Sequence, residues 1–345
     1  MWGVKLPPTT PVVYSIFGVQ RPSGKDDSEQ ELLIQRFTEL ITDQPRHIET
    51  LEQDTPVPTR IWLTYWQSQT EYQQWWTSEP VSTFWASLPD DAGIYREILA
   101  VPPGLTQHGT NNGDRLSGGI AHLGEFESVL DKSGYWGCYY DRMADVTKEN
   151  RFPSPVSKKP TRVTSPLTSI RRGRVTLPTL PDNILFVVEG QDHTYISPEE
   201  KNHWMDNFDK PVEDWIGELV AAGPEKGILD ARVCYDPSSG IYRPADAEPR
   251  ALNFNRKAQL FYFLDMEAME RIGRQNAGHV KLRRKFMHDY GPGGVALELS
   301  PALCLWVEAS ILKGRDVECE YVGCVEGTGL LGLNWDQAAP ESDRL

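Results

Sequence analysis

Two histidines share one helix-forming stretch, and they are the first candidates for metal binding or proton transfer. His279 lies in QNAGHVKLRRKF, residues 275–286, and His288 follows nine residues after it. At about 3.6 residues per turn the two rings face opposite sides of a helix, so they cannot chelate one metal ion together. His279 is therefore either a single ligand to a metal cofactor or a solvent-facing histidine, since four basic residues follow it.

Other common chemical motifs are missing from the chain. It contains no P-loop, GxSxG or HExxH motif, and no GxGxxG between a strand and a helix. The five cysteines form no CxxC pair, which argues against a zinc site or a disulfide framework. We therefore expect a reducing compartment and, since the first twenty residues lack signal-peptide features, a cytoplasmic location.

The net charge of the chain limits the kinds of molecule that we expect it to bind. A formal net charge of -14 argues against nucleic acid or an anionic membrane surface, because neutralising phosphates needs clustered Lys and Arg. No apolar run approaches the roughly 20 residues that span a bilayer. A neutral or cationic small molecule suits this charge better.

The elements that must position His279 follow a recurring order, β-α-β-β-α-β, which is the ferredoxin-like split motif. In the first copy we expect strands at 12–20, 47–53, 60–67 and 93–102, and helices at 27–43 and 70–88. In the second copy we expect strands at 183–192, 227–236, 256–265 and 302–312, and helices at 197–223 and 266–291.

A shift of 197 residues aligns the two copies. It superposes TYWQSQTEYQQWW on FYFLDMEAMERIG and places Ser82 opposite His279. The repeat is therefore structural, and the candidate ligand belongs to the second copy only. In that copy Ser197, Pro198 and Glu200 form a capping-box pattern, which predicts where the helix at 197–223 begins.

Between the two copies, residues 151–175 are rich in proline and in basic residues. This segment has no acidic residue and seven basic ones: Arg151, Lys158, Lys159, Arg162, Arg171, Arg172 and Arg174. Its composition is typical of an exposed linker. Alternatively, some of these arginines reach an anionic cofactor, because Arg binds carboxylates through two parallel hydrogen bonds.

Seven short motifs, taken in their order and spacing, resemble the haem-containing aldoxime dehydratases, the phenylacetaldoxime dehydratase family. They cover nearly the whole chain: FGVQ (17–20), TYW…WW…YREI (64–98), GYWGCYYDRM (134–143), FVVEGQD (186–192), AGHVKL (277–282), LCLWVEASIL (303–312) and CVEGTGLL (324–331).

The resemblance implies an α+β fold, in which two ferredoxin-like modules form a dimeric-type α+β barrel around one b-type haem. Residues 1–130 would form the N-terminal module, 131–182 a connecting segment with the basic linker, and 183–335 the C-terminal module. The resemblance makes His279 the axial ligand of the haem iron. We expect the basic run 281–285 to be divided between haem propionates and solvent.

The activity that the resemblance implies is dehydration of R–CH=N–OH to a nitrile. Ferrous haem b binds the oxime nitrogen, withdraws charge through the metal and weakens the N–O bond. A distal acid protonates the leaving hydroxyl, and a base then removes the carbon-bound hydrogen. The family places a histidine, a serine and an arginine on this distal side.

The sequence departs from the family at two of these three positions. Val307 stands where the family has the histidine and Glu189 where it has the serine, whereas Arg142 retains the arginine. Valine cannot transfer a proton, while a glutamate in an apolar pocket has a raised pKa that suits acid–base work. We expect Glu189 to carry the proton; the alternative is a structural salt bridge with Arg142.

Four functions stay open at this point. The first is a variant aldoxime dehydratase, and the second is a diverged haem enzyme for N–O rearrangement or N–N bond formation. The third is a peroxidase- or oxygenase-type enzyme, and the fourth is a haem carrier or sensor, which would need no inward Glu–Arg pair. The expected partner is a small-molecule oxime or another N–O compound, and a homodimer is allowed for.

Overall fold

The N-terminal half has the expected β-α-β-β-α-β order, in a computed structural model that describes residues 1–24, 26–166, 169–243 and 248–335. Its elements are β2 (Val12–Gln20), α1 (Asp27–Ile41), β3 (His47–Gln53), β4 (Thr59–Trp66), α2 (Gln69–Trp76), α3 (Glu79–Ala86) and β5 (Ile94–Val101). The helical segment expected over 70–88 consists of two helices, α2 and α3, with Pro80 in the first turn of α3.

The C-terminal half repeats this order. Its elements are β10 (Leu185–Asp192), α5 (Pro198–Trp204), a short π-helix (Met205–Asp209), α6 (Lys210–Ala221), β11 (Ile228–Tyr235), β12 (Arg256–Phe263), α7 (Met266–Gln275), α8 (Ala277–Asp289) and β13 (Cys304–Ile311).

Both halves arrange their four strands in the same way. Counted along the chain, the order across each four-stranded sheet is fourth, first, third, second: β5-β2-β4-β3 and β13-β10-β12-β11. The two sheets join where β11 pairs with β3, through Cys234↔Gln53 and Tyr235↔Glu52. The ferredoxin-like order predicted for both copies is thus present, and the copies share one continuous curved sheet.

Further strands extend this sheet at both ends to 13 strands. Beyond β13 lie β6 (Thr106–Thr110), β1 (Trp2–Lys5) and β7 (Glu125–Ser128), and beyond β5 lie β14 (Val317–Val322) and β9 (Arg174–Thr176). A separate two-stranded sheet pairs β8 (Thr161–Arg162) with β15 (Leu333–Asn334), and α4 (Cys138–Asp141) is a single short turn of helix.

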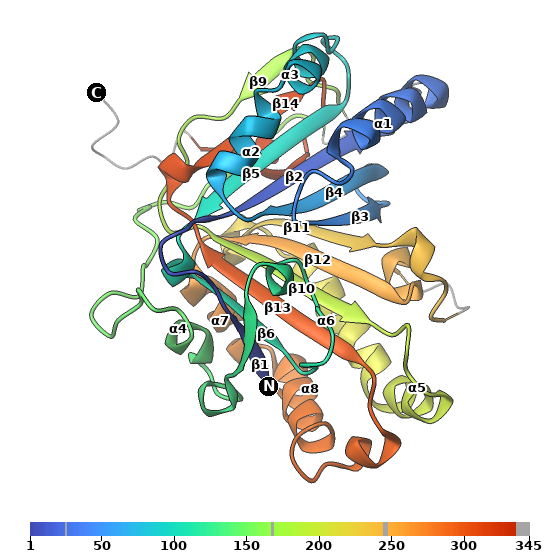
Figure 1. Cartoon of the computed structure of the whole chain (residues 1–345), viewed down its shortest axis with the longest axis vertical. Helices are drawn as coiled ribbons and strands as arrows, with labels where there is room; N and C mark the ends of the chain where they lie inside the picture. The colour runs from blue at the N-terminus through green and yellow to red at the C-terminus, as the bar shows by residue number, and fades with distance from the viewer. Residues whose placement is uncertain (25, 167–168, 244–247, 336–345) are drawn as a thin grey trace.

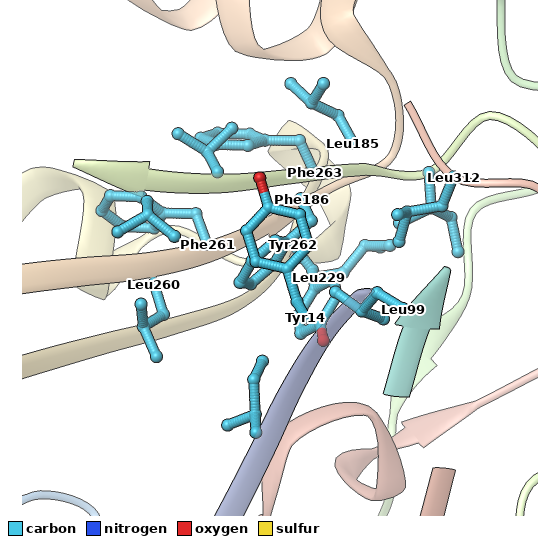
Figure 2. Packing of buried hydrophobic residues seen from close by; sticks show 14 of the residues in the cluster. Tyr14, Leu99, Leu185, Phe186, Leu229, Leu260, Phe261, Tyr262, Phe263 and Leu312 are labelled. Atoms are coloured by element: carbon cyan, nitrogen blue, oxygen red, sulfur yellow. The ribbon is translucent and has the colours of Figure 1, made fainter. Parts of the chain in front are cut away.

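The two halves face each other across the main core, and the helices lie outside. Figure 1 shows α1, α2 and α3 outside the N-terminal half and α5 to α8 outside the C-terminal half. Inside, the Tyr14 ring of β2 meets Phe186 of β10 at 5.4 Å between centroids, and Phe186 meets Tyr262 at 5.0 Å (Figure 2). Because side chains along a strand alternate between the two faces of the sheet, the odd-numbered residues of β10, such as Glu189, point away from this core. They face α6 to α8, the side on which His279 lies.

The helix expected over 266–291 is divided into two. Asn276 has an extended backbone (φ -83°, ψ 110°); its N–H closes α7 on the Ile272 carbonyl, and its side chain accepts from the His279 N–H at 2.7 Å. One asparagine thus caps both helices, and it places His279 in the first turn of α8.

The capping box at the start of α5 is only half formed. Ser197 Oγ accepts from the Glu200 N–H at 3.1 Å, as predicted. The Glu200 carboxylate is fully buried and accepts instead from the N–H groups of Ala302 and Leu303, at 2.7 and 3.1 Å. These N–H groups precede β13 and need a buried acceptor, so the carboxylate is drawn away from its own helix.

The basic segment between the copies serves as a connector. Arg174 forms an ion pair with Glu320, Arg172 lies 3.3 Å from Asp91, and Lys159 donates to the Glu225 carbonyl at 2.6 Å. None of its seven basic side chains, all within the described residues, lines the cavity around His279. The linker interpretation is therefore favoured over the alternative that its arginines reach a cofactor.

Two further features concern the oxidation state of the cysteines and the hydropathy of the helices. The five cysteines are buried free thiols: Cys138, Cys234, Cys304, Cys319 and Cys324. Among the described residues, no helix combines the length and the hydropathy of a membrane span.

Candidate functional site

His279 is held by contacts that leave one ring nitrogen available. Its Nδ1 lies 3.1 Å from the Gly273 carbonyl, an acceptor, so Nδ1 carries the proton and Nε2 keeps its lone pair. The ring stacks on Trp215 at 4.1 Å with an interplanar angle of 19°. Burial lowers the pKa of His279, which favours the neutral imidazole that binds metals. This pattern, one nitrogen on a backbone carbonyl and the other free, is typical of a metal ligand.

The glycine at 273 permits this arrangement. A Cβ on Gly273 would lie 3.2 Å from both the His279 ring and the Trp136 ring. A side chain here would press on the imidazole that the carbonyl orients. Neither Gly273 nor Trp215 was identified from the sequence, since both lie in ordinary helix patterns.

Two of the predicted distal residues, Glu189 and Val307, lie in one row of paired residues across four strands. Glu189 on β10 pairs with Val307 on β13, and Val307 pairs with Gly109 on β6. On the other side, Glu189 pairs with Gln259 on β12. Paired residues point to the same face, and strands are about 4.8 Å apart, so the row spans roughly 14 Å.

Arg142 reaches this row from α4. A Cβ on Gly109 would lie 2.9 Å from Arg142 Nη1, so the missing side chain makes room for the guanidinium. The guanidinium carbon also lies 4.7 Å from the centre of the Tyr139 ring. Arg142 Nε and Nη1 are buried and have no hydrogen-bond partner among the described residues. Two unsatisfied donors beside the row are suited to a bound oxygen atom.

Glu189 stands alone among the described side chains of the site. Within the described part of the chain, it makes no hydrogen bond and no ion pair, and the salt bridge to Arg142 considered above is not formed. Burial raises the pKa of Glu189 to about 7. Burial, followed by the charge of Glu189, also raises the pKa of Tyr139, so this phenol stays protonated. Glu189 is thus a carboxyl group poised to exchange a proton near neutral pH.

Two cavities meet at Glu189. The first, the His279 cavity, measures about 120 Å³ and is lined among others by Tyr139, Glu189, Trp215, Phe263, Met269 and His279. The second, the Val307 cavity, measures about 230 Å³ and is lined among others by Met1, Glu189, Gln259, Phe286, Leu305 and Val307. Glu189 is the one lining residue that the two cavities share.

The basic run after His279 divides in the structure. Arg283 lines the His279 cavity, with its guanidinium carbon 4.6 Å from the centre of the Trp136 ring. Lys285 forms an ion pair with Asp289 at 2.9 Å, and with Lys281 it lines an adjoining hollow that His279 also borders. Arg283 is therefore the member of this run placed to meet an anionic group in the cavity.

The residues present fit a haem, provided that one wall moves. The donor set is a single neutral imidazole with a free Nε2, the walls are largely apolar, and a cation stands at the edge. The cavity is nonetheless smaller than the roughly 300–1,000 Å³ of typical cofactor sites. Trp215 also lines two adjoining hollows of about 610 and 440 Å³. Trp215 is therefore a wall that these two spaces share with the His279 cavity.

Comparison with known structures supports the fold. The chain aligns with a crystal structure of an aldoxime dehydratase in complex with butyraldoxime, with a TM-score of 0.76 and 20% sequence identity over 96% of this chain and 88% of that one. A second aldoxime dehydratase structure gives a TM-score of 0.76 and 19% identity over 96% and 90% of the two chains. The predicted α+β fold is confirmed.

Sequence comparison shows the family. Residues 15–330 match the haem-containing dehydratases, and the chain belongs to that family. It is 22% identical to the phenylacetaldoxime dehydratase of Bacillus sp. (strain OxB-1) over 343 residues, which cover 96% of this chain and 90% of that protein. It is 26% identical to the aliphatic aldoxime dehydratase of Rhodococcus globerulus over 276 residues, which cover 79% and 71% of the two chains.

Proposed function

We propose that this protein is a haem-dependent lyase that dehydrates an aldoxime, R–CH=N–OH, to a nitrile and water, with Glu189 as the acid and base. One observation carries the proposal: the unpartnered Glu189 carboxyl, with a pKa near 7, lines the same cavity as the free Nε2 of His279. Relatives named as aldoxime dehydratases support the substrate class.

In this proposal His279 Nε2 would bind the iron of a b-type haem, and Arg283 beside Trp136 would hold a propionate. Leu219, Phe263 and Met269 supply apolar walls. When bound, a ferrous haem would supply the Lewis acid that weakens the N–O bond of the substrate. The Gly273 carbonyl fixes the orientation of the imidazole through Nδ1.

Glu189 carries out both proton transfers. In its acid form it donates a proton to the oxime hydroxyl as the N–O bond breaks, and water leaves. The resulting carboxylate then removes the carbon-bound hydrogen, which completes the C≡N bond and restores the acid form. One carboxyl can serve both steps because its pKa lies close to neutral pH.

Arg142 and the Val307 cavity position the substrate. The unpartnered Nε and Nη1 of Arg142 donate to the hydroxyl oxygen as it departs. Leu305, Phe286 and Val307 give the second cavity an apolar surface, which accommodates the carbon chain of the oxime. Valine at 307 therefore contributes shape rather than proton transfer.

The pH dependence of kcat/KM follows from the first step. Because the acid form of Glu189 is required, kcat/KM is expected to be constant at low pH and to fall above about pH 7. In Glu189→Gln this inflection should vanish from the residual activity. Initial rates between pH 5 and 9 on the reduced protein test this, and an unchanged inflection in the variant would assign it to another group.

Gly109→Ala is expected to lower turnover by roughly 10- to 100-fold, because a methyl group there displaces the Arg142 guanidinium from the row. Haem content and Tm should change little, since a flexible side chain can yield. Gly217→Ala in α6 is the matched control, because a Cβ there meets no heavy atom within 4 Å. Equal turnover in the two variants would remove Arg142 from the mechanism.

Diverged N–O chemistry is the second candidate, and the valine at 307 favours it. A site without the family's distal histidine can suit N–O rearrangement or N–N bond formation, for which no carbon-bound hydrogen must be removed. Anaerobic incubation of the reduced protein with aldoximes and with hydroxylamines separates the two candidates by product. Turnover that depends on peroxide would instead support a peroxidase-type enzyme.

A cytoplasmic location and a homodimeric state remain predictions within this proposal. The five buried free thiols are compatible with a reducing compartment. Sedimentation of the purified protein measures the oligomeric state directly.

A further inference from the structure

Gln259 is a buried polar side chain that the mechanism above does not use. It is 1% exposed, and its Nε2 has no hydrogen-bond partner among the described residues. It stands directly opposite Glu189 in the β10–β12 pairing, and both side chains line the Val307 cavity. Directly paired residues have Cβ atoms about 5 Å apart, so the amide and the carboxyl border the same space.

An amide in this position needs an acceptor. Buried amides without a partner are destabilising, and native proteins rarely retain them unless a ligand or a water completes the hydrogen bond. Glu189 does not complete it, since it makes no hydrogen bond within the described part of the chain. Phe286, Leu305 and Val307 in the same cavity offer no side-chain acceptor. Other lining residues carry acceptor oxygens, but none accepts from Gln259 Nε2 among the described residues: Thr110, Asn111 and Gln191.

We propose that Gln259 is a further catalytic residue, whose amide N–H donates to the oxygen of the bound N–OH group beside Glu189. This proposal rests on the proposed function, because it names the contact that the N–OH group makes at that site. When the N–O bond breaks, negative charge develops on this oxygen, and an N–H donor stabilises the charge more strongly than it stabilises the ground state. Gln259 therefore contributes mainly to kcat and less to binding.

The test uses Gln259→Leu, which keeps the size of the side chain and removes the donor. A ketoxime retains the N–OH group but has no aldehydic hydrogen, so it binds without forming a nitrile. Calorimetric titration of acetone oxime into the haem-loaded protein should show binding weakened roughly 2- to 10-fold in the variant, as expected for one neutral hydrogen bond. The kcat of Gln259→Leu for an aldoxime of similar size should fall by more than ketoxime binding does, by roughly tenfold or more.

Gln107→Leu is the matched control. Gln107 on β6 is also buried and both its amide atoms lack a partner among the described residues, but it lines neither cavity. Weaker ketoxime binding in Gln259→Leu, with Gln107→Leu like the wild type, supports the proposal. Equal binding by Gln259→Leu and the wild type overturns it while the proposed function stands, and so does an equal loss in both variants. A wild-type protein that binds no ketoxime overturns the proposed function itself.

Discussion

Replacing His279 by Ala is expected to remove most of the Soret absorbance of the purified protein. In the proposed site this imidazole is the single protein ligand to the iron, and its Nε2 is kept free by the bond from Nδ1 to the Gly273 carbonyl. Without it, the haem would be held only by apolar contacts and by Arg283. Added imidazole should restore part of the absorbance, because the truncated side chain leaves room for the free ligand.

His288→Ala is the matched control for this prediction. It lies in the same helix, but its side chain is 77% exposed, its Nδ1 lies 2.8 Å from Asp289 Oδ1, and it does not line the His279 cavity. Haem content should be unchanged in this variant. A His279→Ala protein that keeps its full haem content and spectrum would show that the iron ligand lies elsewhere.

Glu189→Gln is expected to lower turnover of the aldoxime by about 10²–10⁴-fold, the range that general acid–base catalysis typically contributes. Glutamine keeps the shape and the hydrogen-bonding capacity of the side chain but cannot cycle a proton. Haem content and Tm should stay near wild type, because Glu189 has no partner to lose within the described residues. Turnover at the wild-type rate would leave Glu189 without a role in proton transfer.

The double variant Glu189→Ser with Val307→His tests whether Glu189 has taken over the proton transfer that a histidine performs in the family. It restores the histidine and serine that the family is expected to carry at these two positions, which are directly paired across β10 and β13. Nitrile formation in the double variant should recover relative to Glu189→Gln. If the wild-type protein forms no nitrile and the double variant does, the native reaction is diverged N–O chemistry.

The repeated β-α-β-β-α-β order could be read from the sequence because each strand and helix has its own local signal. Alternating apolar residues and caps marked the elements of both copies within a few residues. The strands that extend the same sheet were not predicted: β1, β6, β7, β9 and β14. The break at Asn276 was missed because the residues on both sides, 266–275 and 277–289, are good helix formers, and one asparagine can cap both ways. The second hydrogen bond of the capping box does not form because the Glu200 carboxylate accepts instead from the backbone N–H groups of residues 302 and 303, which are distant in sequence.

Residues of the candidate site could be predicted from the sequence where their chemical type and the family motifs single them out. They could not be predicted where they join the site only through the register of strand pairing. Glu189, Arg142 and His279 stood out through the family motifs. Gln259 and Gly109 complete the row only through strand pairing, which a sequence alone does not give. One signal was nevertheless present in the sequence: Gln259 is the single amide within the apolar run AQLFYFL. A buried amide at such a position is expected to have a hydrogen-bond partner.

Mass spectrometry of the products formed by the reduced protein under anaerobic conditions tests the central claim most directly. Wild type and Glu189→Gln, matched for haem content, are incubated with one aliphatic and one aromatic aldoxime. The proposed mechanism predicts nitrile from the wild type without any oxidant, and at least about 100-fold less nitrile from the variant. Equal nitrile from both proteins, or none from the wild type, would contradict it.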